Sequence, residues 1–446
     1  MDAEALLAGY AAGTLTPVQA LQAVTERIAR RNPAINAFAL LDPAALKAAQ
    51  ASTARWASGR PQGVLDGVPV TVKDLIDVAG LPTRRGSKTT EATPAAADAP
   101  LVRALRAAGA VITGKTTTTE FGWKSPGDCP LHGITRNPWN TAHTPGGSSA
   151  GAAAAAAAFF GPLHVGTDAG GSVRIPAAWS GVVGLKPSFG RVPQWPLGAF
   201  GHVAVAGPIT HSVRDAALLL SAIAVFDPAD PFSLPQDPTD YRAGIEDGVS
   251  GLRIGVLDHP GFAAPADADA QGAVATARAI LAAQGARVED FAVALPDTSE
   301  VFTLVWGAAL ARLVAGTPEG QRGQLDAGLR QVAARFADVP AAALLAAEAA
   351  RVQAAHAMAA LPYDAILCPC VPHAAPLAEA PAADPVAALW RDWAPWTFLF
   401  NLTRQPAVSL PLGVNAAGLP VAVQIAAPLY RDDVALRVAW AVERAL

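Results

Sequence analysis

Cysteine is scarce in this chain, with three residues in a length of 446. So few thiols exclude the disulfide framework of a small secreted domain and suit a reducing compartment. Two of the three, Cys368 and Cys370, are separated by a single proline, which is closer than the usual spacing of zinc ligands. We interpret this segment as strand-end packing and expect no metal site.

Charged residues are also few, at 16% of the chain, and the formal net charge is only −4. This mild negative charge lacks the basic footprint of a nucleic-acid-binding protein. The first residues, 1–4, contain no basic stretch, which argues against a secretory signal. The uncharged run from Thr144 to Thr167 is long enough for a membrane span. Because it is mostly Ala, Gly, Ser and Pro, we interpret it as a buried helix, and we expect a cytoplasmic protein that binds neither nucleic acid nor a membrane.

The same region, extended to Pro176, holds two glycine-flanked turns that carry hydroxyl groups. Glycine lets a backbone approach a ligand closely, and consecutive free N–H groups in such a turn can bind an anion. Ser148, Ser149 and Ser172 are therefore candidates for nucleophilic chemistry with oxyanion donors beside them. Glycine and serine are common in ordinary turns, but two such turns joined by a helix-sized and a strand-sized segment favour a functional site.

Three motifs identify a family. They are Gly-Val-Pro-Val-Thr-Val-Lys-Asp at 67–74, Gly-Gly-Ser-Ser-Ala-Gly at 146–151 and Gly-Thr-Asp-Ala-Gly-Gly-Ser-Val-Arg-Ile-Pro at 166–176. Together they resemble the amidase signature family, whose members use a Ser–Ser–Lys triad. Further matches lie at 114–115, 120–121, 135–139 and 184–188, with weaker ones at 406–411 and 418–420. The good coverage is therefore roughly 60–215.

The resemblance implies a role for each matching residue. Ser172 is the acylated nucleophile, Lys73 is the base, and Ser148 is the bridging serine, which in the family follows a cis peptide bond, here after Gly147. The implied oxyanion hole consists of backbone N–H groups, namely those of Ala169, Gly170, Gly171 and Ser172. No cofactor is implied. The resulting activity is that of an amidase acting on small carboxylic amides, aliphatic or aryl.

The chemistry agrees with these roles. A serine hydroxyl needs a base to take its proton, and a lysine can serve only when its amine is neutral. The reference pKa of lysine is about 10.4, so burial or nearby positive charge must lower it by ~3 units. The β-branched run from Val68 to Lys73 predicts a buried strand that presents Lys73 at its carboxyl end, where open α/β sheets place their sites. Asp74 would point to the opposite face of that strand and need not pair with Lys73.

Substrate contacts are harder to predict. Trp123 and the aromatic cluster from Trp390 to Phe398 are candidates for the pocket wall. Arg174 could bind an anionic group of the substrate, but we favour a structural ion pair. Asp168 is expected either to accept hydrogen bonds that shape the glycine turn or simply to cap the loop.

Alternating helix and strand segments predict an α/β fold. Together with the resemblance, they indicate a single large domain, 1–446, with a central mixed β-sheet flanked by helices on both faces. The signature core is 60–215, and about 226–400 is a variable, mostly helical region that should shape the substrate pocket. Near the N-terminus, a helix that begins at Pro17 is expected to end near Arg31, before Asn32-Pro33.

Two other functions stay open. Residues 147–151 also fit Gly-x-Ser-x-Gly, the nucleophile elbow of an α/β-hydrolase-like esterase, with Ser149 as nucleophile. That motif needs a strand directly before it, and 140–145 is not strand-like. Alternatively, the chain is the A-type subunit of an amidotransferase and works with a partner. The oligomeric state is open as well, with a homodimer as one option.

Overall fold

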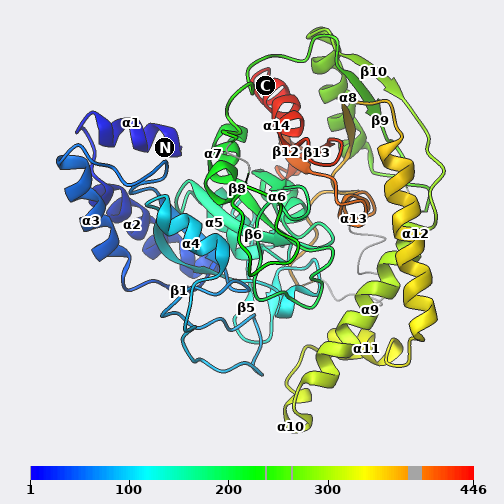
Figure 1. The fold of residues 1–446 in the computed structure, drawn as a ribbon, viewed down its shortest axis with the longest axis horizontal. Helices are drawn as coiled ribbons and strands as arrows, with labels where there is room; N and C mark the ends of the chain where they lie inside the picture. Colours follow the sequence, from blue (N-terminus) through cyan, green and yellow to red (C-terminus); the bar gives the residue numbers. More distant parts are fainter. Residues whose placement is uncertain (1, 237–238, 263–264, 380–393) are drawn as a thin grey trace.

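The computed structural model describes residues 2–236, 239–262, 265–379 and 394–446. Its strands alternate with helices along most of the chain (Figure 1). The strands are β1 (Phe38–Leu41), β2 (Pro69–Lys73), β3 (Val111–Thr116), β4 (Asp128–Cys129), β5 (Gly133–Ile134), β6 (Leu163–Asp168), β7 (Val183–Lys186), β8 (Val205–Thr210), β9 (Arg253–Val256), β10 (Arg287–Asp290), β11 (Ala365–Pro369), β12 (Ala407–Val414) and β13 (Pro420–Ala426).

The helices include one short 3₁₀ turn. They are α1 (Ala3–Ala11), α2 (Pro17–Ile35), α3 (Ala45–Ala57), α4 (Pro100–Ala107), η1 (Glu120–Gly122), α5 (Ala150–Ala157), α6 (Arg174–Ser180), α7 (Val213–Ile223), α8 (Ala268–Ala283), α9 (Thr298–Gly316), α10 (Glu319–Arg322), α11 (Ala327–Arg335), α12 (Ala341–Ala359), α13 (Thr397–Leu402) and α14 (Asp432–Glu443).

One mixed sheet runs through the described residues, with eleven strands in the order β1-β3-β2-β6-β8-β7-β12-β13-β11-β9-β10. The strands β3, β2 and β6 are parallel neighbours, and so are β11, β9 and β10. Between these two groups, β8, β7, β12 and β13 pair antiparallel. The mixed α/β sheet that the sequence and the resemblance predict is therefore confirmed.

Helices cover both faces of this sheet. On one face α5 and α6 pack together, and alanines of α5 form a small core with Val173 and Ile209. On the other face α4, α7, α14 and α8 follow one another over the largest core cluster, which includes Leu163 and Val165 of β6. Alanine side chains let α5 lie close to the strands, because little volume separates the two backbones.

Helices α9 to α12 lie along one side of the molecule, away from α1 to α3 (Figure 1). Within the described part of the chain, α9 is the one helix long and apolar enough to cross a membrane by length and composition. Only 39% of its most apolar stretch is buried in protein, and it packs against α11 and α12. Its buried face includes Phe302 and Trp306, which stack on each other.

Most of the predicted elements form, and one boundary is wrong. The helix α2 continues past the expected stop, through Pro33 to Ile35. Proline lacks one N–H donor, but here it lies in the last turn, where the helix is about to end. Asn36, in the left-handed region at φ 59°, ends the helix and donates its N–H to the Asn32 carbonyl at 2.7 Å.

Candidate active site

The sheet topology brings two predicted segments together. β2 ends at Lys73 and β6 ends at Asp168, and the two strands are parallel neighbours. Their carboxyl ends therefore meet at one edge of the sheet, as expected for an open α/β sheet. The glycine turn, 169–172, follows β6 directly. Ser148 and Ser149 precede α5, and the peptide bond between Gly147 and Ser148 is cis, as the resemblance implies.

Lys73 is fully buried, and its Nζ has four oxygens within hydrogen-bonding distance. They are Ser148 Oγ at 2.8 Å, Ser149 Oγ at 2.9 Å, Thr167 Oγ1 at 2.9 Å and the Thr167 carbonyl oxygen at 3.3 Å. Burial lowers the pKa of the Lys73 amine well below its ordinary value, and the Asp168 carboxylate opposes this shift. Burial therefore shifts the lysine towards its neutral form, which is the form able to act as a base.

Asp74 does not pair with Lys73. Its carboxylate forms a fully buried ion pair with Lys115 at 2.8 Å. The two adjacent residues point to opposite faces of the strand, as predicted. Lys73 is thus left with neutral hydrogen-bond partners.

Asp168 organises the turn that carries Ser172. Its carboxylate accepts hydrogen bonds from the backbone N–H groups of Gly171 at 2.7 Å and Val173 at 3.1 Å. Burial opposes ionisation of this carboxyl group, but the Arg174 guanidinium holds its pKa well below the usual range. The expectation that Asp168 shapes the glycine turn is confirmed.

Arg174 is fully buried and pairs with Asp168 at 2.9 Å. It also donates to the Thr397 carbonyl at 2.8 Å and to the side chains of Asn401 and Gln424, each at 2.6 Å. The structural ion pair is therefore confirmed. The substrate-binding role considered for Arg174 is wrong, because its guanidinium is enclosed by protein acceptors and does not line the cavity described below.

The predicted oxyanion donors differ among themselves. The Gly171 N–H is taken by Asp168, so Gly171 drops out of the expected set. Among the residues that the structure describes, the N–H groups of Ala169, Gly170 and Ser172 have no hydrogen-bond acceptor. Gly171 has a structural reason to be glycine: its φ is +129°, and a Cβ there would lie 2.7 Å from Ile175 Cδ1.

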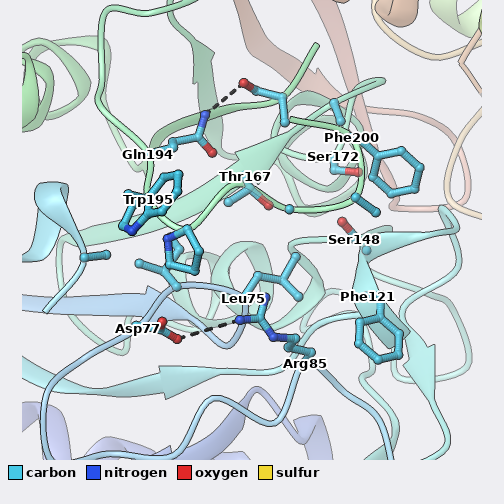
Figure 2. A pocket seen from close by; sticks show the side chains of 18 of the residues that line it. Leu75, Asp77, Arg85, Phe121, Ser148, Thr167, Ser172, Gln194, Trp195 and Phe200 are labelled. Atoms are coloured by element: carbon cyan, nitrogen blue, oxygen red, sulfur yellow. Dashed lines mark hydrogen bonds and ion pairs between the residues drawn. The ribbon is translucent and has the colours of Figure 1, made fainter. Parts of the chain in front are cut away.

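A cavity of about 800 Å³, open mouth included, lies over these groups. Ser148, Thr167 and Ser172 line it, and Figure 2 shows the two serines on the same side of it, near Phe200. The Ser172 hydroxyl is buried and has no hydrogen-bond partner in the described part of the chain. Most of the remaining wall is apolar and includes Leu75, Ile76, Phe121, Trp195, Phe200 and Leu313.

This lining corrects one prediction. Trp123 is buried in a core cluster and does not line the cavity, whereas Phe121 of the same turn does. Of the region 226–400, Leu313 is the one described residue that lines the cavity, and residues 380–393 lie outside the described part. In the predicted aromatic cluster, Trp390 and Trp393 lie outside the described residues, and Phe398 is buried in the core.

The pocket residues that sequence reasoning missed, above all 194–200, follow no motif. Trp195 lies half exposed at the cavity, before a cis bond to Pro196. The Trp-Pro pair in a glycine-rich loop is the one available signal, but it does not indicate which way the ring points.

The nucleophile-elbow alternative is not supported by the geometry. Residues 135–149 are all described, and no strand directly precedes Ser149. Ser149 is fully buried and does not line the cavity. Its hydroxyl donates to the Thr167 carbonyl at 3.2 Å and accepts from the Thr167 N–H at 3.3 Å. It is a support for Lys73 rather than an exposed nucleophile.

A family model described as Amidase matches residues 19–436 of the chain. The chain belongs to the amidase family. An acylamidase from Rhodococcus erythropolis is 35% identical over 449 residues, which cover 98% of this chain and 94% of that protein. The A-type subunit of a glutamyl-tRNA(Gln) amidotransferase from Acidothermus cellulolyticus is 37% identical over 477 residues, covering 99% and 93%.

The solved structure of a bacterial aryl acylamidase of the amidase signature family matches this amidase with a TM-score of 0.91. The sequence identity is 27%, and the match covers 100% of this chain and 96% of that one. The amidase is therefore a hydrolase that acts on amide C–N bonds, with the fold of the amidase signature enzymes.

Proposed function

We propose that this amidase hydrolyses small carboxylic amides, aliphatic or aryl, through an acyl-enzyme on Ser172, with Lys73 as base and Ser148 as proton relay. One observation carries the proposal. The buried amine of Lys73 lies 2.8 Å from Ser148 Oγ, and Ser148 lines a cavity that Ser172 also lines. A relay and a nucleophile therefore border one space that a substrate can enter, with the base directly behind the relay.

The hydrogen bonds around Lys73 leave two hydroxyls, those of Ser148 and Thr167, as candidate relays. A neutral amine has two N–H donors and one lone pair. The Thr167 carbonyl can only accept, and the Ser149 hydroxyl already donates to that carbonyl, so both are acceptors for Lys73. The lone pair is then left for a hydroxyl. In the described part of the chain, Ser148 Oγ and Thr167 Oγ1 each have Lys73 as their one hydrogen-bond partner, so either proton is free to be shared with the amine, and the family resemblance selects Ser148.

The reaction follows from this arrangement. Ser172 Oγ attacks the amide carbonyl while its proton passes to Ser148 and the Ser148 proton passes to Lys73. The C–N bond then breaks, and the amine leaves with the proton returned through Ser148. Water attacks the acyl-enzyme by the same route and releases the acid. The N–H groups of Ala169, Gly170 and Ser172 stabilise the oxyanion at both stages, and no cofactor is required.

The cavity walls support the substrate class. Phe121, Phe200, Trp195 and Leu313 provide flat and branched apolar surface, which suits an aryl or alkyl group attached to the scissile amide. The acylamidase and aryl acylamidase relatives act, as their names say, on amides of this general kind. We extend that activity to this chain.

The amidotransferase relatives favour a second candidate, an A-type subunit that works with a partner. Both functions use the same proposed triad, but an amidase works alone whereas the A-type subunit needs a partner protein. We favour the free-standing amidase, in the cytoplasm, as a monomer or homodimer. The chain of 446 residues is then a single catalytic domain built on the 60–215 core.

The test is a panel of aliphatic amides and anilides incubated with the purified chain alone, without ATP or tRNA, with release of ammonia or amine as the readout. We expect turnover of at least one class, abolished in Ser172→Ala. Turnover by Ser172→Ala at the wild-type rate contradicts the acyl-enzyme. Activity that appears only after a partner protein is added supports the amidotransferase instead.

A further inference from the structure

Asp77 and Arg85 form a polar corner in the otherwise apolar cavity. Both line it together with Ser148 and Ser172. Arg85 Nη2 lies 3.9 Å from Asp77 Oδ1, as the dashed line in Figure 2 marks. Hydrogen bonds between such groups measure about 2.7–2.9 Å, so the two charges attract each other across a gap without closing it.

Both side chains have unused hydrogen-bonding capacity. In the described ranges neither makes a hydrogen bond, and the side chains of Arg85 and Asp77 are 29% and 23% exposed. The guanidinium carries five N–H donors and the carboxylate only accepts. An ion pair this long and this exposed adds little to stability, so a purely structural role does not explain it.

The backbone holds Arg85 in place. Its N–H donates to the Asp74 carbonyl at 3.1 Å, and its carbonyl accepts from the Phe121 N–H at 2.8 Å. Arg85 also has φ +52°, in the left-handed region that a long side chain seldom adopts and that tends to mark functional sites. The turn is therefore fixed between the end of β2, which carries Lys73, and the pocket wall at Phe121.

The charges of Asp77 and Arg85 determine which kind of substrate group can bind between them. The pair is neutral as a whole, so a charged group gains from one partner and is repelled by the other. A neutral group with one acceptor and one donor can gain from both. Gln194, another polar residue of the cavity, uses one side-chain N–H to donate to the Ala204 carbonyl at 2.8 Å. A carboxamide is the simplest group that carries both functions.

We propose that Asp77 and Arg85 are specificity residues for a second amide group in the substrate. The distal carbonyl accepts from Arg85 and the distal N–H donates to Asp77, while the scissile amide lies at Ser172. The preferred substrates are then diamides with an aliphatic or aryl spacer. This inference rests on the proposed function, because it names the substrate of the same site.

The experiment uses acyl p-nitroanilides of three spacer lengths, each ending in a carboxamide, a methyl ester, a carboxylate, an ammonium or a methyl group. The ester keeps the distal carbonyl and lacks the N–H. We expect the carboxamide to have the highest kcat/KM at one spacer length, at least about tenfold above the ester, since a hydrogen bond to a charged group is among the stronger ones.

Variants test whether Asp77 and Arg85 cause the preference for the carboxamide. Asp77→Ala should reduce the carboxamide-to-ester ratio towards one, because only the carboxamide has the distal N–H. Arg85→Met should lower kcat/KM for the carboxamide and the ester alike, relative to the methyl-terminated substrate, because both have the distal carbonyl. Arg84→Met is the matched control, because Arg84 lies on the same turn but donates to Thr90 Oγ1 at 3.3 Å and does not line the cavity. Arg84→Met should leave the kcat/KM ratios among the distal groups unchanged, and it should also keep the activity on the methyl-terminated substrate. A variant of Arg85 that lowers every substrate equally indicates a structural role and overturns the proposal.

Two further outcomes overturn it: equal kcat/KM for carboxamide and ester at every spacer length, or a preference for the carboxylate or the ammonium. Calorimetric binding to Ser172→Ala separates this inference from the proposed function. Tighter binding of diamides than of ester–amides supports the corner even if no anilide is hydrolysed. Equal binding of the two refutes the corner even if simple anilides are cleaved.

Discussion

At the scale of single residues, the main feature is a buried lysine whose pKa is lowered by its surroundings. Lys73 has no carboxylate partner in hydrogen-bonding distance among the described residues, since Asp74 is paired with Lys115 and Asp168 with Arg174. An ion pair would have held the proton on the amine. Both nearby acids are thus neutralised by other cations, and Lys73 is left to hydroxyl and carbonyl oxygens.

The first prediction concerns which hydroxyl relays the proton. Lys73→Ala should lower kcat/KM by about 10²–10⁴-fold, the usual worth of a general base, and Ser148→Ala should approach that loss. Thr167→Val is the matched control, because it removes the other cavity hydroxyl near Lys73 Nζ. It and Ser149→Ala should cost about tenfold or less, the value of one hydrogen bond. Initial rates on one anilide decide the order, and a larger loss in Thr167→Val would assign the relay to Thr167.

The second prediction is the pH dependence. The base works only when Lys73 has lost its proton, so kcat/KM should rise with pH at a slope of about one and level off above the pKa of the folded enzyme. Because burial lowers that pKa well below its ordinary value, the plateau should be reached well below pH ~10.4, the reference pKa. A limb that still rises near pH ~10 would show that the amine is not perturbed.

The residue scale also shows where sequence reasoning stops. The proposed triad could be named from the sequence because each of its members lies in a motif of the family. Sequence alone suggests Trp123 as a pocket aromatic, whereas the structure places Phe121 at the cavity. The direction of each ring depends on the backbone of η1, where Phe121 has φ +51°. No local pattern predicts that conformation.

At the scale of elements, the glycine turn is supported by a helix far along the chain. Thr397, the first residue of α13, donates through its hydroxyl to the Gly170 carbonyl at 2.7 Å. Asn401 of the same helix donates to the Asp168 carbonyl at 3.1 Å. α13 thereby fixes the direction of the peptide groups that flank the proposed oxyanion donors.

The third prediction tests this support. Thr397→Val removes the hydroxyl and keeps the shape, so it should lower kcat about tenfold through misplaced N–H donors, with KM little changed. Thr403→Val is the control, because the Thr403 hydroxyl donates within its own helix end, to the Leu399 carbonyl at 3.0 Å, and not to the turn. Steady-state kinetics on one substrate compares them. Equal losses in the two variants would mean that Thr397 acts only on stability.

The fourth prediction concerns the packing of α9 on α11. A Cβ at Gly307 would collide with the ring of Phe336, just after α11. Helix propensity favours alanine over glycine by about 1 kcal/mol, but overpacking costs about 1–3 kcal/mol, so Gly307→Ala should lower the melting temperature. Gly316→Ala, at the open end of the same helix with no atom within 4 Å, should not. A thermal melt of each variant gives the answer, and equal melting temperatures would show that the ring moves aside freely.

At the scale of the whole molecule, the sheet class and the position of the site are predictable, and the walls of the cavity are not. Strand runs such as Pro69–Lys73 and Leu163–Asp168 are readable from local pattern. Their adjacency, which makes the site, requires the family resemblance. The variable region is the natural source of the pocket by sequence, yet among described residues the fold brings only Leu313 of it to the cavity.

The contacts of Arg174 with residues distant in the sequence have a consequence for folding during synthesis. Its guanidinium is fixed by Thr397, Asn401 and Gln424, which are synthesised more than two hundred residues after it. A nascent chain that has emerged only through residue 215 carries Lys73, both serines, the glycine turn and the Asp168–Arg174 ion pair, but it lacks the three later acceptors of the guanidinium. We therefore expect hydrolytic activity only after the C-terminal strands have been synthesised and folded, and truncated translation products should be inactive.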